Sequence, residues 1–169
     1  QAKSPGVFNP LIAAGGSKAV LVPFWVRRDD FDAAMAGSMR IANLAGIVVT
    51  LPFKERAMAL ADRVLDVGAT VGAINALRRE ADGTWTGEMF DGFGLIGALA
   101  TIDVLPRGLR FALLGAGGAG SAIAISLALE GAAVITITDP DGDKAAQLAE
   151  RVQARVPACR AVAGAPSVE

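Results

Sequence analysis

The chain of 169 residues lacks histidine altogether and contains a single cysteine, Cys159. One cysteine cannot form a disulfide within the chain, and without histidine neither a transition-metal site nor a histidine-based catalytic triad is expected. The sequence therefore predicts no metal centre, and any catalysis has to come from other side chains.

Aromatic residues make up only 5% of the chain, the net charge is −1, and no basic tract or heptad repeat is present. Nucleic-acid binding is not expected, because it needs clustered cations and usually aromatic stacking platforms. No signal peptide is recognisable, so we expect a cytoplasmic protein. The uncharged stretch 111–129 has the hydropathy of a membrane span, but its central glycines and charged flanks favour a strand, a turn and a helix. No membrane partner is expected.

Apolar residues (53%) and glycine (20 residues) are abundant, and residues 115–120 combine them in the pattern G-x-G-x-x-G. In a dinucleotide-binding turn, Gly115 would permit the tight turn, Gly117 would let the backbone approach a pyrophosphate, and Gly120 would let the helix pack closely on the sheet. The alternative is an ordinary turn between a strand and a helix. The expected cofactor contacts are Gly115, Ala116, Gly117, Gly118, Ala119 and Gly120.

A second β-like run, 133–138, ends at Asp139, which lies 19 residues after Gly120. In dinucleotide-binding folds an acidic side chain at this place holds the ribose diol of the adenosine. Asp139 is therefore a further expected cofactor contact. Its alternative role is to cap the helix that Pro140 begins.

Apolar runs and turn residues predict an α/β fold. Strands are expected at 19–26, 46–51, 73–79, 84–87, 109–114 and 133–138, with one short strand in the tail 155–169. Helices are expected at 7–14, 29–39, 53–64, 91–101, after the glycine turn to residue 129, and at 140–156. Residues 68–72 are expected as a break and 105–108 as a linker. The unbroken apolar runs indicate strands buried on both faces of a parallel sheet, and Asp82-Gly83 indicates a hairpin.

Thr50 and Lys54 follow the expected strand 46–51 at its carboxyl end, where open α/β sheets bind ligands. Lys54 also falls in the first turn of the expected helix 53–64, where the helix dipole disfavours a cation. A lysine at such a place can donate or accept a proton when a carboxylate orients it. The alternative is a solvated surface lysine.

Five short motifs stand in the order and approximate spacing found in shikimate dehydrogenases. They are Lys3-Ser4-Pro5, Thr50-Leu51-Pro52-Phe53-Lys54, Gly72-Ala73-Ile74-Asn75-Ala76, Gly87-Glu88-Met89-Phe90-Asp91-Gly92 and residues 115–120. The chain thus resembles the shikimate dehydrogenase family over nearly its whole length. The resemblance implies a substrate-binding α/β domain at 1–104 and a Rossmann domain for the nicotinamide cofactor at 105–169. The reaction would take place in the cleft between them.

The resemblance also implies roles for individual residues. Lys54 would be the catalytic acid and base, and Asp91 its paired carboxylate, while Ser4, Thr50 and Asn75 would contact the substrate. Each has a plainer alternative: Asp91 could cap a helix, Asn75 could be a turn residue, Ser4 a loop residue and Thr50 a β-former. Two tryptophans are expected to serve in packing. They are Trp25 and Trp85.

The chain departs from the family pattern at three positions. Ala2 stands where the family often has a second serine, and Met89 and Phe90 stand where it commonly has asparagine and threonine. A less polar wall is expected, so the substrate could be quinate or another cyclic hydroxy acid instead of shikimate.

The expected cofactor is NAD or NADP, with NAD favoured. Members that use NADP typically carry Asn-Arg-Thr after the second Rossmann strand, whereas residues 138–143 of this chain present three carboxylates and no arginine. Such a segment would repel a 2′-phosphate.

The resemblance implies a reversible hydride transfer between NAD(P)H and 3-dehydroshikimate or a related acid, in the pathway of aromatic amino acid biosynthesis. The competing hypothesis is a paralogue that binds a small hydroxy acid or nucleotide without turnover. A monomer or a homodimer is expected. Because the chain does not begin with methionine and stops after the first half of a Rossmann domain, both ends are expected to be incomplete.

Overall fold

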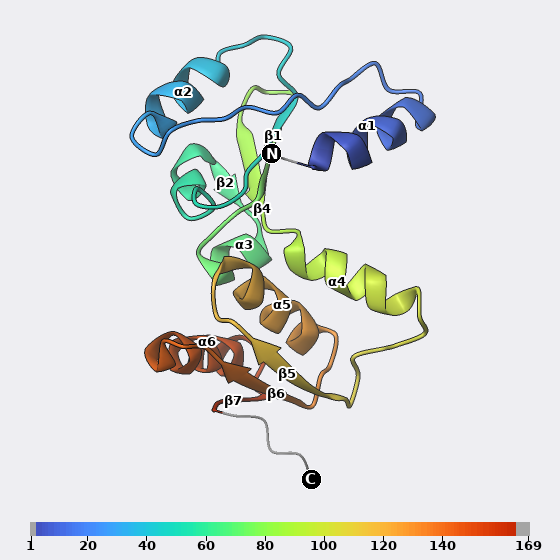
Figure 1. The fold of residues 1–169 in the computed structure, drawn as a ribbon, viewed down its shortest axis with the longest axis vertical. Coiled ribbons are helices and arrows are strands. Elements are labelled where there is room, and N and C mark those ends of the chain that lie inside the picture. The colour runs from blue at the N-terminus through green and yellow to red at the C-terminus, as the bar shows by residue number, and fades with distance from the viewer. Residues whose placement is uncertain (1–2, 165–169) are drawn as a thin grey trace. The chain divides into compact units, whose positions relative to one another are not determined.

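The computed structural model describes residues 3–164 and divides into two compact units, Gln1–Ser38 and Met39–Glu169, each described here by itself (Figure 1). Ala2 and the last part of the tail, 165–169, lie outside the described residues. Between residues 3 and 164, no helix has both the length and the apolar character needed to cross a bilayer.

The first unit contains helix α1 (Ser4–Ala14), an extended segment at 17–26 and helix α2 (Phe31–Ser38). Both helices confirm the prediction, and α1 ends at Gly15 as expected. The strand predicted at 19–26 is wrong, because in the described chain this segment pairs with no other strand. An apolar run becomes a strand only where a neighbour supplies hydrogen bonds.

The side chain of Asn9 binds the extended segment instead. Its Nδ2 donates to the carbonyl oxygen of Leu21 at 3.1 Å, and its Oδ1 accepts from the Leu21 N–H at 2.7 Å. Pro23, in the middle of the segment, has no N–H to give to a ladder. Trp25 is 86% exposed, so the expected packing role is wrong for this residue, whereas Trp85 is buried as predicted.

The second unit begins with a four-stranded sheet in the order β1-β3-β4-β2. Its strands are β1 (Gly46–Val48), β2 (Arg63–Val64), β3 (Ala76–Arg79) and β4 (Trp85–Glu88). β3 and β4 pair antiparallel across a turn in which Gly83 has φ +89°, which confirms the hairpin. β1 is an edge strand that pairs antiparallel with β3 and leaves Val48 53% exposed. The predicted burial of 46–51 on both faces of a parallel sheet is therefore wrong.

The helix predicted at 53–64 is also wrong, since the segment contains only the short 3₁₀ helix η1 (Arg56–Leu60) and then β2. Its backbone is engaged by the neighbouring hairpin. The Ile74 N–H donates to the Lys54 carbonyl at 2.9 Å, and the Asp62 N–H donates to the Trp85 carbonyl at 2.9 Å. These bonds hold the two ends of the segment beside the sheet, so a continuous helix cannot form.

The break predicted at 68–72 is replaced by helix α3 (Asp66–Val71). Gly68 lies inside this helix because its position is crowded: an added Cβ would lie 3.0 Å from side-chain atoms of Ile74 and Val64. The helix ends where Gly72 adopts the left-handed conformation with φ +75°.

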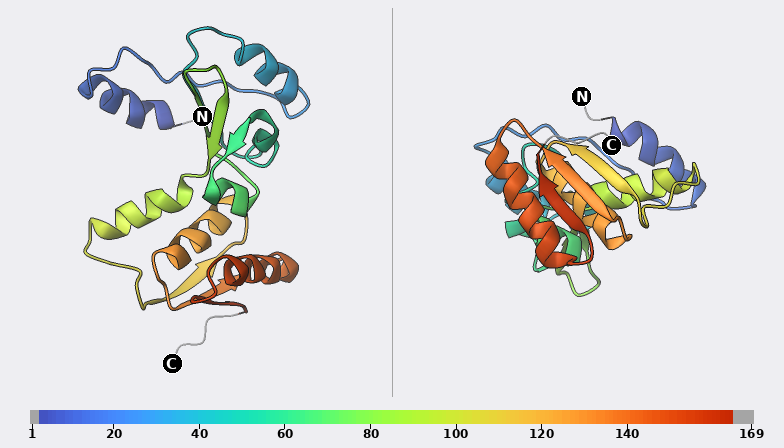
Figure 2. Two further views of the ribbon diagram at one scale, coloured as in Figure 1. Left: turned by 180° about the vertical axis from the view of Figure 1, so that it is seen from behind. Right: turned by 90° about the horizontal axis from the view of Figure 1, so that it is seen from below.

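Helix α4 (Asp91–Ala100) and the predicted loop at 105–108 lead to a parallel sheet in the order β5-β6-β7 (Figure 2). Its strands are β5 (Arg110–Leu114), β6 (Val134–Thr138) and β7 (Arg160–Ala163), connected by helices α5 (Gly118–Leu129) and α6 (Gly142–Arg155). This alternation is one half of a Rossmann fold. The α/β fold class is confirmed, and β7 is the short strand expected in the tail.

One hydrophobic core extends from α3 to the parallel sheet. Val67 and Val71 of α3 and the buried Met89 belong to the same cluster as the apolar residues of α5, β6 and α6. The core also contains Ala73 and Met89, so it brings the start of β3 and the end of β4 close to the start of α5. The domain division expected between residues 104 and 105 stays a prediction.

Candidate active site

Lys54 and Asp91 form an ion pair with 2.5 Å between Nζ and Oδ2. Their side chains are 12% and 24% exposed, so the pair is largely shielded but reachable from solvent. Lys54 lies in the turn after β1, and Asp91 is the first residue of α4. A charge-assisted hydrogen bond of this length orients the ammonium group.

Asn75 holds the other oxygen of Asp91. Its Nδ2 donates to Asp91 Oδ1 at 2.6 Å, and its Oδ1 accepts from the Phe90 N–H at 2.9 Å. The start of α4 shows no side-chain cap, so the capping role considered for Asp91 is not observed. Because one Nδ2 hydrogen of Asn75 is used by Asp91, the second is left for another acceptor.

Thr50 belongs to the same loop as Lys54, whereas Ser4 belongs to the other unit. Thr50 is exposed at the carboxyl end of β1, and its carbonyl accepts from the Phe53 N–H at 3.0 Å. Ser4 is half-buried and begins α1. Substrate contacts for both residues remain predictions, and Ala2 lies outside the described residues.

The glycine turn has the geometry that its spacing predicts. Gly115 has φ +104°, and an added Cβ on Gly120 would overlap the Gly115 carbonyl oxygen. Nothing lies within 4 Å of the place where a Cβ on Gly117 would stand. No side chain caps the start of α5, so its first N–H groups can receive an anion. These residues fit a dinucleotide.

The glycine turn lies next to the ion pair. The Cδ atom of Lys54 is 3.9 Å from the position that a Cβ on Gly118 would take. A cavity of about 680 Å³ borders the turn, and Glu55, the residue after Lys54, shares its lining with Lys144 and Arg151 of α6. The structure thus places a group that can carry a proton beside a turn that fits a cofactor.

Asp139 directly follows β6 and is hydrogen-bonded to the glycine turn. Its Oδ2 accepts from the Ala116 N–H at 2.7 Å, and its Oδ1 accepts from the Asp141 N–H at 2.9 Å. The bond from Ala116, followed by that from Asp141, lowers the pKa of Asp139. Helix α6 is capped by Asp141, whose side chain accepts from the Asp143 N–H, so the capping role considered for Asp139 is not observed.

Glu88 is a buried carboxylate near the site that the sequence did not indicate. Its Oε1 accepts from the N–H groups of Gly68 and Met89, both at 2.7 Å. These bonds fix the end of β4 three residues before Asp91. In sequence Glu88 is one polar residue of a hairpin strand, and its partner Gly68 is 20 positions away, so no local pattern could reveal the contact.

The less polar wall that was expected at Met89 and Phe90 is possible at Phe90 but not at Met89. Met89 is completely buried in the core and cannot face a ligand, so the expectation is wrong for this residue. Phe90 is 51% exposed, and its ring centroid lies 5.9 Å from that of Phe93. Of these two residues, only Phe90 can therefore add apolar surface beside Asp91.

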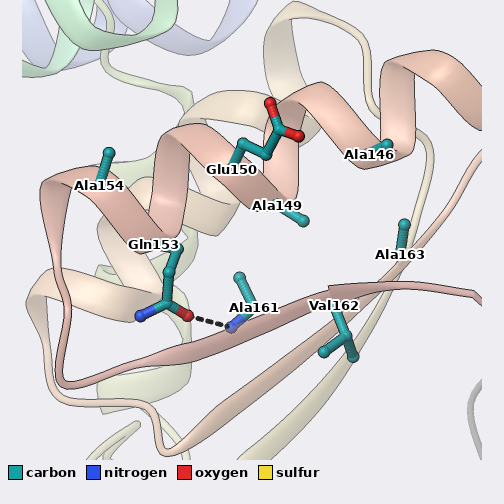
Figure 3. A pocket seen from close by; sticks show the side chains of 8 residues that line it. All are labelled: Ala146, Ala149, Glu150, Gln153, Ala154, Ala161, Val162 and Ala163. Carbon is teal, nitrogen blue, oxygen red and sulfur yellow. Dashed lines mark hydrogen bonds between the residues drawn. The ribbon is translucent and has the colours of Figure 1, made fainter.

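A second cavity lies away from these residues, between α6 and β7 (Figure 3). It is lined mainly by alanines and Val162, and Gln153 there accepts a bond from the Ala161 N–H at 3.4 Å. None of the candidate site residues lines it, so it is not the predicted site.

Comparison with known families divides the chain into two matching parts. Residues 1–77 match the shikimate dehydrogenase substrate-binding domain, and residues 110–167 match a family described as NADP oxidoreductase, coenzyme F420-dependent.

Individual proteins agree with these matches. A shikimate dehydrogenase (NADP(+)) of Geobacter metallireducens is 37% identical over 151 residues, which cover 89% of this chain and 52% of the relative. The chain spans about half the length of the curated relatives it matches. The ligand-free 5-ketofructose reductase of Gluconobacter sp. strain CHM43 is similar in structure, with a TM-score of 0.89 and 29% identity over 99% of this chain and 59% of that one. A Listeria monocytogenes shikimate 5-dehydrogenase in complex with shikimate and NAD has a TM-score of 0.88 and 29% identity, covering 96% and 56%.

Proposed function

We propose that the protein, whose residues 1–77 match the shikimate dehydrogenase substrate-binding domain, is an NAD(P)-dependent oxidoreductase that acts on a CH–OH group of a cyclic hydroxy acid. The reaction is the reversible interconversion of shikimate and 3-dehydroshikimate, or of quinate and its ketone. The observation that carries the proposal is the pair of Lys54 and Asp91, 2.5 Å apart and next to the glycine turn.

Lys54 moves the proton in this proposal. When bound, the nicotinamide takes up or supplies the hydride. During oxidation the neutral amine of Lys54 accepts the proton of the substrate hydroxyl, and during reduction its ammonium returns that proton to the carbonyl oxygen. Asp91 orients Nζ through Oδ2. General acid–base catalysis of this kind contributes about 10²- to 10⁴-fold to the rate.

In this proposal Asn75 and Thr50 form hydrogen bonds with the substrate. The hydrogen of Asn75 Nδ2 that Asp91 does not use can donate to a hydroxyl of the substrate. Thr50 is exposed on the loop that carries Lys54, so its hydroxyl can also form a hydrogen bond with the substrate. Ser4, which has a hydroxyl at the start of α1, is proposed to bind the carboxylate of the substrate.

We propose NAD as the preferred cofactor, with NADP as the alternative. The charged carboxylate of Asp139 has a lone pair left on each oxygen for the ribose hydroxyls, and it would repel a 2′-phosphate. Lys144 favours the alternative, since it pairs with Asp141 at 3.5 Å and its charge also acts on Asp139. Both cofactors occur among the relatives, as NADP(+) in the Geobacter enzyme and NAD in the Listeria complex.

The exposed ring of Phe90 favours a substrate other than shikimate as the second candidate. It stands directly before Asp91, where it makes one side of the proposed site less polar. A quinate-type acid, or a sugar ketone as in the similar 5-ketofructose reductase, is therefore a reasonable competitor.

The test is turnover of the complete protein with shikimate, quinate and 5-ketofructose, each with NAD(H) and NADP(H), followed by nicotinamide absorbance. Turnover with a cyclic acid supports the proposal. Binding of an acid or nucleotide without turnover in any combination would instead support the non-catalytic paralogue. Light scattering of the same sample decides between the proposed monomer and homodimer.

A further inference from the structure

The start of α4 packs tightly against α5 at a single glycine, Gly92. An added Cβ on Gly92 would overlap the hydroxyl oxygen of Ser126 and lie 2.5 Å from the carbonyl oxygen of Ala122 and 2.7 Å from the Cβ of Ser126. Atoms cannot approach so closely, so any side chain at this position would push the two helices apart.

The other glycines of α4 show that the close contact is local. Added Cβ atoms on Gly94 and Gly97 would meet nothing within 4 Å. The helix therefore tolerates a side chain at these two positions but not in its first turn.

Ser126 contributes an unusual group to this contact. Its hydroxyl is buried and has no hydrogen-bond partner among the residues that the structure describes. Buried polar groups are normally paired, and this hydroxyl lies against Gly92, the only glycine of α4 at which an added Cβ would meet another atom within 4 Å.

The contact involves the helix that begins at the glycine turn. Ala122 lies four residues after Gly118, or about 6 Å along the axis of α5, and Gly118 is the residue beside Lys54. Asp91 directly precedes Gly92 in the first turn of α4. Helix α5 thus begins next to the lysine side chain and, slightly further along, packs against Gly92, the neighbour of the paired carboxylate.

We propose that Gly92 and Ser126 are positioning residues: their contact sets the distance between α4 and α5 and thereby keeps Asp91 on Lys54 and Asn75 while the pair faces the glycine turn. This inference rests on the proposed function for its effect on catalysis. Neither residue touches the reacting atoms.

The experiment compares Gly92→Ala with Gly94→Ala in the complete protein. Both add one methyl group to the same helix, but only the first pushes α4 from α5. Gly92→Ala is expected to lower kcat by about 10²-fold, the effect of a misplacement of about 1 Å, with nearly unchanged cofactor Kd. Gly94→Ala is expected to keep the wild-type kcat. Combining Gly92→Ala with Ser126→Gly, which removes two of the three close contacts, is expected to restore part of the loss.

Crystal structures of the two alanine variants give a readout that does not depend on turnover. The distance between Lys54 Nζ and Asp91 Oδ2 is expected to exceed hydrogen-bond range in Gly92→Ala and to stay unchanged in Gly94→Ala. If Gly92→Ala does not fold, Ser126→Val crowds the same contact from α5 and is expected to give the same loss. If the wild-type protein is inactive, the proposed function is wrong, but the distance between Lys54 Nζ and Asp91 Oδ2 still tests the inference. Gly92→Ala with wild-type kcat and an undisturbed ion pair would overturn the inference.

Discussion

The guanidinium of Arg151, in α6, donates a hydrogen bond to the carbonyl oxygen of Val71 at 3.0 Å, although the two residues are 80 positions apart. Val71 is the last residue of α3. Arg151 also reaches the hydroxyl of Ser121 at 3.4 Å, and that hydroxyl donates to the carbonyl of Ala116 in the glycine turn at 3.3 Å. The arginine therefore connects α3, α6 and the glycine turn.

Arg151→Ala is expected to lower the free energy of unfolding by about 1 to 2 kcal/mol, because a charge-assisted bond to a helix end is lost. Urea denaturation measures the change. Arg155→Ala is the matched control: it removes the exposed pair of Arg155 with Asp66 at 3.7 Å, which should cost at most about 0.5 kcal/mol. Equal effects of the two substitutions would show that Arg151 makes no special connection.

Asn75→Ala is expected to lower kcat/KM by roughly 10- to 100-fold, the effect of losing one hydrogen bond to a charged group. The substitution removes the donor to Asp91 Oδ1 and the acceptor of the Phe90 N–H. Steady-state kinetics measures the loss, and Asn43→Ala, an exposed position outside the site, serves as control. If Asn75→Ala keeps the wild-type kcat/KM, the hydrogen bond from Asn75 to Asp91 is not needed for catalysis.

Asp139→Asn is expected to weaken NAD binding by about 10-fold or more, since the ribose loses a charged acceptor, and to leave NADP binding equal or tighter. Isothermal titration with both cofactors checks this. Asp143→Asn removes a nearby charge that is not in the predicted ribose contact and should change both affinities little. The ribose role is excluded if Asp139→Asn binds NAD like the wild type.

Two glycines of the turn are expected to respond differently to alanine. Gly120→Ala should lower the free energy of unfolding by about 1 to 3 kcal/mol, because its Cβ would overlap the Gly115 carbonyl oxygen. Gly117→Ala should leave stability nearly unchanged, since nothing lies within 4 Å of its Cβ, but should weaken cofactor binding. Thermal unfolding and cofactor titration separate the two effects. Unchanged cofactor affinity in Gly117→Ala would contradict the predicted pyrophosphate position.

Much of the second unit could be predicted because its signals are local. The turn at Gly83 and the spacing of the glycine turn each depend on a few consecutive residues. The same holds for the ends of β5 and β6, where the strand residues stop at Gly115 and Asp139.

The failed predictions depend on partners that are distant in sequence. The segment 19–26 has strand composition but no strand beside it, and 53–64 has helix formers whose backbone is bound by the hairpin. The direction of the Met89 side chain is set by the core around α5, and the bond from Glu88 to Gly68 crosses 20 positions. A pattern of consecutive residues contains no information about such contacts.

The most direct test of the account is the kinetics of Lys54→Ala in the complete protein, measured with the best substrate and cofactor of the wild type. The account predicts that kcat falls by about 10²- to 10⁴-fold while the cofactor Kd stays within about twofold, because only the proton-carrying group is removed. A Lys54→Ala protein that turns over at the wild-type rate would contradict the account.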